Sequence, residues 1–396
     1  VGGLNAGGAG HLIISNGLAV VGFLQTCRAN GKFGHVDIHD GSLIVLTNAF
    51  LGNSANSTSL VELTHPRSLL TVSNGPVNVG VYSNSLSTLV LSNGTMVSKS
   101  MGVGSSTLAG PGMVANLFIY NATNLITETS VATDALSIGG RVAATGMVLL
   151  AHAGAVLESP GRVYLGKDGE GRLIISNGTV RFPGVLIMAN NFGSVGKMSI
   201  GDGSLSVDGR FTLGASGSAV VNLDHPNALI ALGTNTLRVA DAALGVTNMS
   251  VLNISNGTLT ALSGDSTLGS AGAHSESTGI INMQGGLLDL GTGNLLIGNR
   301  RGTVGILNLN AGTVMVNRIR IPADSIDLAC TGTLQMAGGA LHLSGLESAA
   351  KTVPAQSNIW FSGGTLVAQG NFTNALTTTL TNAPGPGLVT YDTLAN

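Results

Sequence analysis

The sequence has few charged residues, few aromatic residues and only two cysteines. Charged residues make up 9% of the 396 residues, and 17 Lys and Arg against 19 Asp and Glu leave a formal net charge of −2. The chain therefore offers no basic field for nucleic acid or anionic lipid. Its most apolar run, Gly146–Leu157, is too short to span a bilayer and contains His152. We predict no transmembrane helix and no membrane insertion of this segment.

What the chain does contain is apolar material and glycine. Hydrophobic residues make up 43%, which excludes a disordered segment, and 59 glycines without a Gly-X-Y period exclude collagen. The stretch Arg172–Phe182 (RLIISNGTVRF) is apolar at every second position on both sides of Ser-Asn-Gly. This alternation predicts two short strands, each with one inward face, joined at a sharp bend.

Bends of this kind recur along the whole chain, for example at Gly17, Gly41, Gly178, Gly286 and Gly312. Most are 24 to 31 residues apart, a period typical of solenoids. Each repeat reads as a strand of the type L-x-I, the bend, a second strand and a third strand that ends in glycine. No apolar stripe of helical period persists, and β-branched residues are frequent.

We therefore predict an all-β fold, a right-handed parallel β-helix of about 14 turns of roughly 27 residues, with three short strands per turn. In such a fold Ser-Asn-Gly is a corner and not a hairpin. Five asparagines are predicted to hold the same corner, where their amides would hydrogen-bond from turn to turn as a ladder: Asn16, Asn74, Asn93, Asn177 and Asn256.

A longer repeat lies on top of the turns. His11–Gly17 recurs as Arg172–Gly178 at an offset of 161, and Val61–Leu69 recurs as Val221–Leu229 at an offset of 160. We predict a single β-solenoid over residues 1–396, with a first six-turn unit at 11–171, a second at 172–334 and a partial third at 335–396. The first residue lies inside repeat-like sequence, so we expect a mature form or a fragment.

The two cysteines, Cys27 and Cys330, are too few for a disulfide framework or a metal cluster. In the predicted fold about 12 turns of roughly 4.8 Å separate them, far beyond the ~7 Å Cα limit of a disulfide. We expect both to be small apolar residues of the structure.

The C-terminal part resembles a known family. Phe361–Leu366 (FSGGTL), Asn371–Thr373 (NFT) and Gly387–Asp392 (GLVTYD) are similar to the autotransporter-associated β-strand repeat of long bacterial surface and secreted proteins. The upstream L-x-I-S-N-G-T turns resemble the passenger repeats that accompany it. The resemblance implies an extracellular right-handed β-helix at the cell surface. Nothing in the chain resembles the membrane-spanning translocator barrel of that family.

Candidate chemistry is sparse. His35, Asp37 and His39 share one face of a predicted strand and form a weak candidate metal site, but the second copy has Lys197, Ser199 and Gly201 there. Gly166–Gly171 (GKDGEG) suggests a phosphate loop only superficially, because no Ser or Thr follows the Lys and no helix follows the loop. The His65-Pro66 and His225-Pro226 pairs recur at equivalent places and indicate structural bends. We expect no cofactor.

The sequence favours a structural protein, a rigid stalk or self-assembling fibre that associates end to end or continues in a longer chain. The first alternative is an adhesin passenger that binds an extracellular glycan or a host surface. A remote alternative is a polysaccharide lyase or hydrolase. Such enzymes need acidic side chains held close together on adjacent turns. The acidic residues of this chain occupy no equivalent places in neighbouring turns except at bends, so we do not expect an enzyme.

Overall fold

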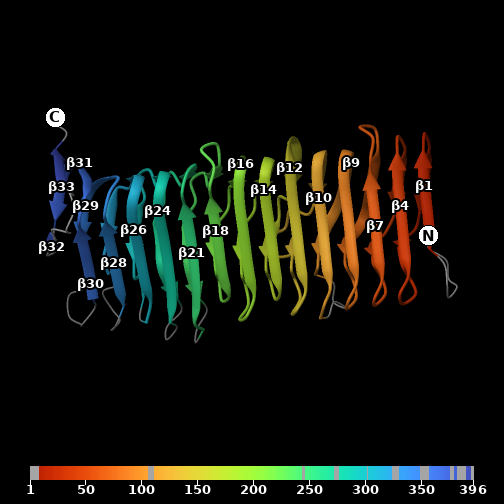
Figure 1. The fold of residues 1–396 in the computed structure, drawn as a ribbon, viewed down its shortest axis with the longest axis horizontal. Helices are drawn as coiled ribbons and strands as arrows, with labels where there is room; N and C mark the ends of the chain where they lie inside the picture. Colours follow the sequence, from red (N-terminus) through yellow and green to blue (C-terminus); the bar gives the residue numbers. More distant parts are fainter. Residues whose placement is uncertain are drawn as a thin grey trace. The chain divides into compact units, whose positions relative to one another are not determined.

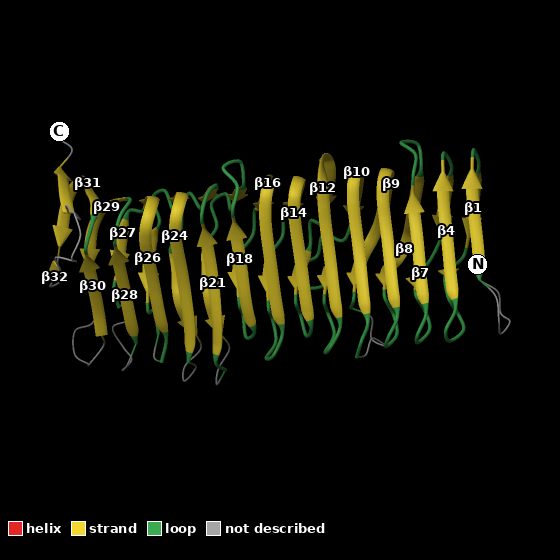
Figure 2. Ribbon diagram, in the orientation of Figure 1, coloured by secondary structure: helices red, strands yellow, loops and turns green. Residues whose placement is uncertain are grey.

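The computed structural model describes residues 9–105, 111–242, 246–271, 276–300, 302–322, 330–347, 356–374, 379–380 and 389–393. These residues form strands and loops only, with no helix among them (Figures 1 and 2). The chain divides into two compact units, residues 1–205 (unit 1) and 206–396 (unit 2). The copy boundaries near residues 171 and 334 remain a prediction.

Unit 1 contains the first fifteen strands and most of the sixteenth. They are β1 (Gly10–Ser15), β2 (Leu18–Val21), β3 (Leu24–Gln25), β4 (Phe33–His39), β5 (Ser42–Val45), β6 (Ala49–Leu51), β7 (Thr58–Leu63), β8 (Leu69–Val79), β9 (Leu86–Val103), β10 (Val114–Ile126), β11 (Asp134–Ile138), β12 (Thr145–Glu158), β13 (Arg162–Leu165), β14 (Glu170–Phe182), β15 (Leu186–Met188) and β16 (Val195–Val207).

Unit 2 contains the remaining strands. They are β17 (Phe211–Leu213), β18 (Ser218–Leu223), β19 (Leu229–Ala231), β20 (Leu237–Ala242), β21 (Asn248–Ile254), β22 (Thr258–Thr260), β23 (Ser266–Ala271), β24 (Ser277–Asp289), β25 (Asn294–Ile297), β26 (Val304–Met315), β27 (Arg318–Arg320), β28 (Thr331–Met336), β29 (Ala340–Glu347), β30 (Gln356–Phe361), β31 (Gly364–Asn374), β32 (Thr379–Leu380) and β33 (Val389–Thr393).

Within each unit, every strand pairs in parallel with its equivalent one turn away. In unit 1, β4 pairs with β1 on one side and with β7 on the other, and Figure 1 shows these strands lying side by side. In unit 2, β24 pairs with β21 and β26 in the same way. The described strands make about 13 turns spaced about 26 residues apart. The predicted parallel β-helix is confirmed, and Ser-Asn-Gly is a corner.

The predicted three strands per turn are present. At many corners the backbone pairing between turns continues without a break, so that two or three of these strands form one continuous element. A turn therefore consists of a first strand of the L-x-I type, a second strand after the bend and a third strand that ends at glycine. In β9 all three run on as one element, and in β14 the first and second do. Measured between paired first strands, the turns of unit 1 range from 24 residues, Gly10 to Gly34, to 31 residues, Ala115 to Gly146.

The core lies inside the coil and is made of the alternating apolar positions that the sequence predicts. In the first strands of unit 1, a single inward column contains side chains that are at most 1% exposed: Val36, Val61, Leu89, Leu117, Val148 and Leu173. Each packs on a similar residue in the turns before and after it. Burial of such stacked aliphatic side chains is the main stabilising term.

The third strand of most turns ends at a residue with positive φ. Glycine holds this place at Gly139 and Gly166, for example, while Cys27, Ala189 and Ala240 also adopt positive φ at the ends of third strands. At Gly166, φ is 76°, and a Cβ would stand 2.1 Å from the carbonyl oxygen of Val195 in the next turn. Glycine there provides both the backbone conformation and the space that the next turn fills.

Gly193 provides a matched control for the close approach of the next turn at Gly166. Its φ is 77°, but a Cβ there would meet nothing within 4 Å. We expect Gly193→Ala to cost about 1–2 kcal/mol for the left-handed conformation alone. Gly166→Ala should cost a further ~1–3 kcal/mol because the methyl group meets backbone. Chemical denaturation of both variants, followed by circular dichroism, measures the difference. Equal destabilisation by the two changes would contradict the close stacking at Gly166.

Candidate functional site

The side chains of His35, Asp37 and His39, the weak candidate metal ligands, each contact a residue of the next turn. The three side chains lie on the outer face of β4, but His35 Nε2 is 2.9 Å from a carboxylate oxygen of Glu62 in the next turn. Thr64 Oγ1 lies 3.3 Å from Asp37 Oδ1 and 3.1 Å from His39 Nδ1. Among the residues that the structure describes, no group of three or more His, Cys, Asp or Glu side chains is arranged to hold a metal ion. Each candidate ligand instead has a partner in the next turn.

The two His-Pro pairs form the bends that the sequence predicts. The backbone amide of Ser68 donates to the carbonyl of His65 at 2.8 Å, and that of Ala228 donates to His225 at 2.9 Å. In both bends the ring Nδ1 of the histidine accepts from a backbone amide two residues later, at 3.3 Å. The imidazoles thus cap tight turns, as Asx side chains do elsewhere.

Both cysteines are buried. The Sγ of Cys27 donates to the carbonyl oxygen of Thr58 at 2.9 Å, and burial raises the pKa of this thiol. A thiol with a raised pKa is a poor nucleophile near neutral pH. The burial of both residues fits the interpretation that they are small apolar residues of the structure.

The predicted corner ladder of asparagines is largely wrong. Asn74 lies at a different corner, because Leu69–Val72 and Pro76–Val79 pair with the second and third strands of the next turn. Its side chain donates to the carbonyl oxygen of Leu46. Asn177 accepts from the amide of its own neighbour, Gly178, at 2.8 Å.

Of the five predicted members, only Asn93 has a side-chain bond to an asparagine in an adjacent turn. Its partner is Asn121, whose Nδ2 lies 3.2 Å from the Asn93 Oδ1. No such link is formed by Asn16 or Asn256 with any described residue. The corners fail as a ladder chiefly because the adjacent turn holds another residue at the equivalent place, with Asp40 following Asn16 and Ala151 paired with Asn177. A register shift between Ile119 and Thr123 adds to the mismatch at one corner.

A continuous asparagine ladder exists elsewhere, on the outer face of the first strands of unit 2. Its four members occupy paired positions in successive turns: Asn222, Asn253, Asn282 and Asn308. From Asn253 onward, each Nδ2 donates to the asparagine Oδ1 of the preceding turn, at distances of 2.8, 2.9 and 2.8 Å. The sequence signal is an asparagine between two aliphatic residues at the same place in each first strand, as in Val221-Asn222-Leu223.

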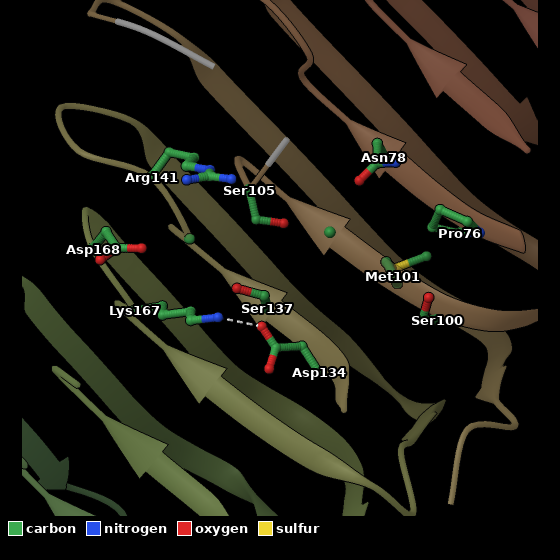
Figure 3. A pocket seen from close by; sticks show the side chains of 12 residues that line it. Pro76, Asn78, Ser100, Met101, Ser105, Asp134, Ser137, Arg141, Lys167 and Asp168 are labelled. Carbon is green, nitrogen blue, oxygen red and sulfur yellow. Dashed lines mark hydrogen bonds and ion pairs between the residues drawn. The ribbon is translucent and has the colours of Figure 1, made fainter. Parts of the chain in front are cut away.

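The second feature of interest is a polar pocket in unit 1, with a volume of about 300 Å³ (Figure 3). Residues from four successive turns line it, including Asn78 from β8, Gly102 from β9, Ser137 from β11 and Lys167 from the loop after β13. The ladder register aligns Asn78, Gly102 and Ser137 on neighbouring third strands. A Cβ on Gly102 would stand 2.1 Å from Ser105 Oγ and 2.8 Å from Asn78 Oδ1, so the absence of a side chain there gives room to these two polar groups.

Charged side chains stand along one side of this pocket. Lys167 Nζ is 2.5 Å from Asp134 Oδ2 and 5.0 Å from the ring centroid of Tyr164, which fixes the ammonium group at the wall. The guanidinium of Arg141 forms no ion pair with any residue that the structure describes. The Oγ of Ser137, a residue only 6% exposed, has no hydrogen-bond partner in the described chain.

A second hollow, the neighbouring pocket, adjoins the polar pocket and shares Asp168 with it. Its volume is about 330 Å³, and its lining includes Val142, Glu170 and Phe192. Phe192 is 77% exposed. Hydrogen bonds from Lys197 and Arg172, each 2.8 Å from the carboxylate, lower the pKa of Glu170. Glu170 is therefore ionised at neutral pH.

The sequence offered no motif for either pocket. Gly166–Gly171 resembles a phosphate loop only superficially, and the structure forms a bend there. Lys167 and Asp168 of this bend nevertheless line the polar pocket. The pocket forms only where four turns stack on one another. The sequence of any single turn therefore contains no motif that indicates it.

Comparisons with known proteins identify no relative. No protein-family model, no curated protein and no solved structure matches this chain. The resemblance to autotransporter-associated repeats therefore remains a prediction. The structure contains no helix long and apolar enough to cross a membrane among the residues it describes.

The ladder in unit 2 gives a direct prediction. Asn253→Ala removes two side-chain hydrogen bonds and leaves Asn222 Oδ1 and Asn282 Nδ2 without their partners, so we expect a loss of about 1–3 kcal/mol in unfolding free energy. Asn310→Ala, at an exposed corner position, is the matched control and should change stability by less than ~0.5 kcal/mol. Denaturation curves for both variants measure this. If the ladder did not contribute to stability, the two variants would have the same denaturation midpoint.

Proposed function

We propose that the chain is an extracellular structural protein of the bacterial cell surface, which serves as a rigid stalk or assembles into a fibre. The observation that supports this is the unbroken parallel pairing of equivalent strands within each unit. Backbone hydrogen bonds between turns run along the stacking direction, and every turn contributes several of them. A stretching force along that direction is shared among many bonds.

Side chains add to the connections between turns. The asparagine ladder links four turns of unit 2, and ion pairs join neighbouring turns in both units, as Lys197 does with Glu170. Exposed ion pairs contribute little singly. Most of the ion pairs join neighbouring turns, although Arg172–Glu170 and Arg238–Asp241 lie within one turn. The prevalence of pairs between turns supports a role in which cohesion along the stack matters.

The surface location rests on the sequence resemblance to autotransporter-associated repeats. The adhesin alternative is favoured by one specific observation, the polar pocket of unit 1 with its unpaired Arg141 and Ser137. A stalk that also carries a binding site would combine both roles. The remote lyase or hydrolase alternative has no observation of its own to favour it.

Electron microscopy of the purified chain tests the structural role. We expect isolated thin rods if the protein is a stalk, and uniform filaments that lengthen with protein concentration if it polymerises. Analytical ultracentrifugation of the same samples distinguishes the two by mass. Compact particles at all concentrations, with no elongated form, would contradict the proposal.

A further inference from the structure

The polar pocket contains groups that are ready to bind but have no partner. Ser137 Oγ is buried, faces the hollow in Figure 3 and lacks a hydrogen bond within the described chain. Native proteins keep few buried hydroxyls in this state, because an unpaired polar group forfeits its bonds to water. Arg141 and Asn78 border the same hollow, and neither side chain has a hydrogen-bond partner among the described residues.

The lining indicates the class of ligand. Two cations, Arg141 and Lys167, stand against two carboxylates, Asp134 and Asp168, so the pocket has no excess charge. A phosphate site needs a surplus of cations or a cluster of backbone amides. A lipid site needs an apolar lining. A balanced set of hydrogen-bond donors and acceptors suits a ligand whose groups can both donate and accept hydrogen bonds. Hydroxyl groups do both.

Size and surroundings narrow the class further. A volume of about 300 Å³ lies at the small end of ligand pockets and suits one sugar ring rather than an extended molecule. The neighbouring pocket begins across Asp168 and presents the exposed ring of Phe192. The negative face of an aromatic ring attracts the C–H groups of a sugar. Two adjoining sites of different character therefore lie side by side on unit 1.

We propose that the polar pocket binds one sugar residue of a glycan chain and that the neighbouring pocket holds the next residue against Phe192. Asn78, Ser137 and Arg141 hydrogen-bond the hydroxyl groups of the first sugar, while the Lys167–Asp134 pair forms a polar wall. This inference does not depend on the structural role, since a stalk and an isolated domain would bind equally well.

The test uses the full chain on an array of neutral hexose, N-acetylhexosamine and uronate oligosaccharides. The tetrasaccharide that binds best is then titrated by calorimetry against the wild-type chain and its variants. We expect Arg141→Gln and Asn78→Ala to weaken binding about tenfold or more. Phe192→Ala should weaken binding of the tetrasaccharide and leave binding of the corresponding monosaccharide unchanged.

Matched controls separate the site from general effects on the fold. Arg181→Gln and Tyr120→Ala change exposed side chains of the same two types elsewhere in unit 1 and should bind as the wild type does. Ser137→Ala should weaken binding without lowering the denaturation midpoint, because no bond within the described chain is lost. A residue with a purely structural role would show the opposite pattern.

Three results would overturn the proposal. The first is that no oligosaccharide on the array binds at millimolar concentration. The second is binding that the Arg141, Asn78 and Ser137 variants leave unchanged, since the glycan would then sit elsewhere. The third is saturable binding of inorganic phosphate or a fatty acid in place of sugar at the same residues. Because Arg141 and Phe192 are surface positions, their variants are expected to fold, as circular dichroism verifies.

Discussion

Parallel backbone pairing between successive turns is the interaction on which the rest of this structure depends. Because strands pair with their equivalents one turn away, each residue lies beside the residue at the same place in the next turn. Inward columns must then be apolar throughout, and outward columns bring like side chains together. The low aromatic content follows, since aliphatic side chains superimpose more easily than large rings in a narrow coil.

The same constraint explains both features of the surface. In the first strands of unit 2 the register is unshifted from Asn222 to Asn308 apart from the corners, and four amides meet at hydrogen-bonding distance. In unit 1, stacking places Asn78, Gly102 and Ser137 in one row, where the missing side chain of Gly102 gives room to polar side chains that line the pocket. The asparagine ladder and the polar pocket thus come from one repeated geometry.

The period, the strand faces and the parallel topology could be predicted from the sequence, because alternation and repeated bends are local signals. Val36 and Ile38, which alternate along the strand with the outward-facing His35, Asp37 and His39, are fully buried. The asparagine ladder was predicted at the wrong place. Asn-Gly marks a bend, but corner loops differ in length and conformation, as Asn16 and Gly178 show by carrying the positive φ at different positions. Strand centres keep a fixed register, and there the amides align. The pocket could not be predicted, because its residues come from four turns and share no motif.

Disulfide crosslinking in unit 2 tests the in-register stacking most directly. Asn253 pairs with Asn282, and Val251 with Ile280, so Asn253 and Ile280 lie on the same face but two residues out of register. In the Asn253→Cys/Asn282→Cys variant, adjacent paired positions fall within the Cα range of a disulfide, and oxidation should join them. The Asn253→Cys/Ile280→Cys variant should remain reduced under the same conditions. Efficient crosslinking of the second pair with none in the first would contradict the register and, with it, the account of the fold and of both surface features.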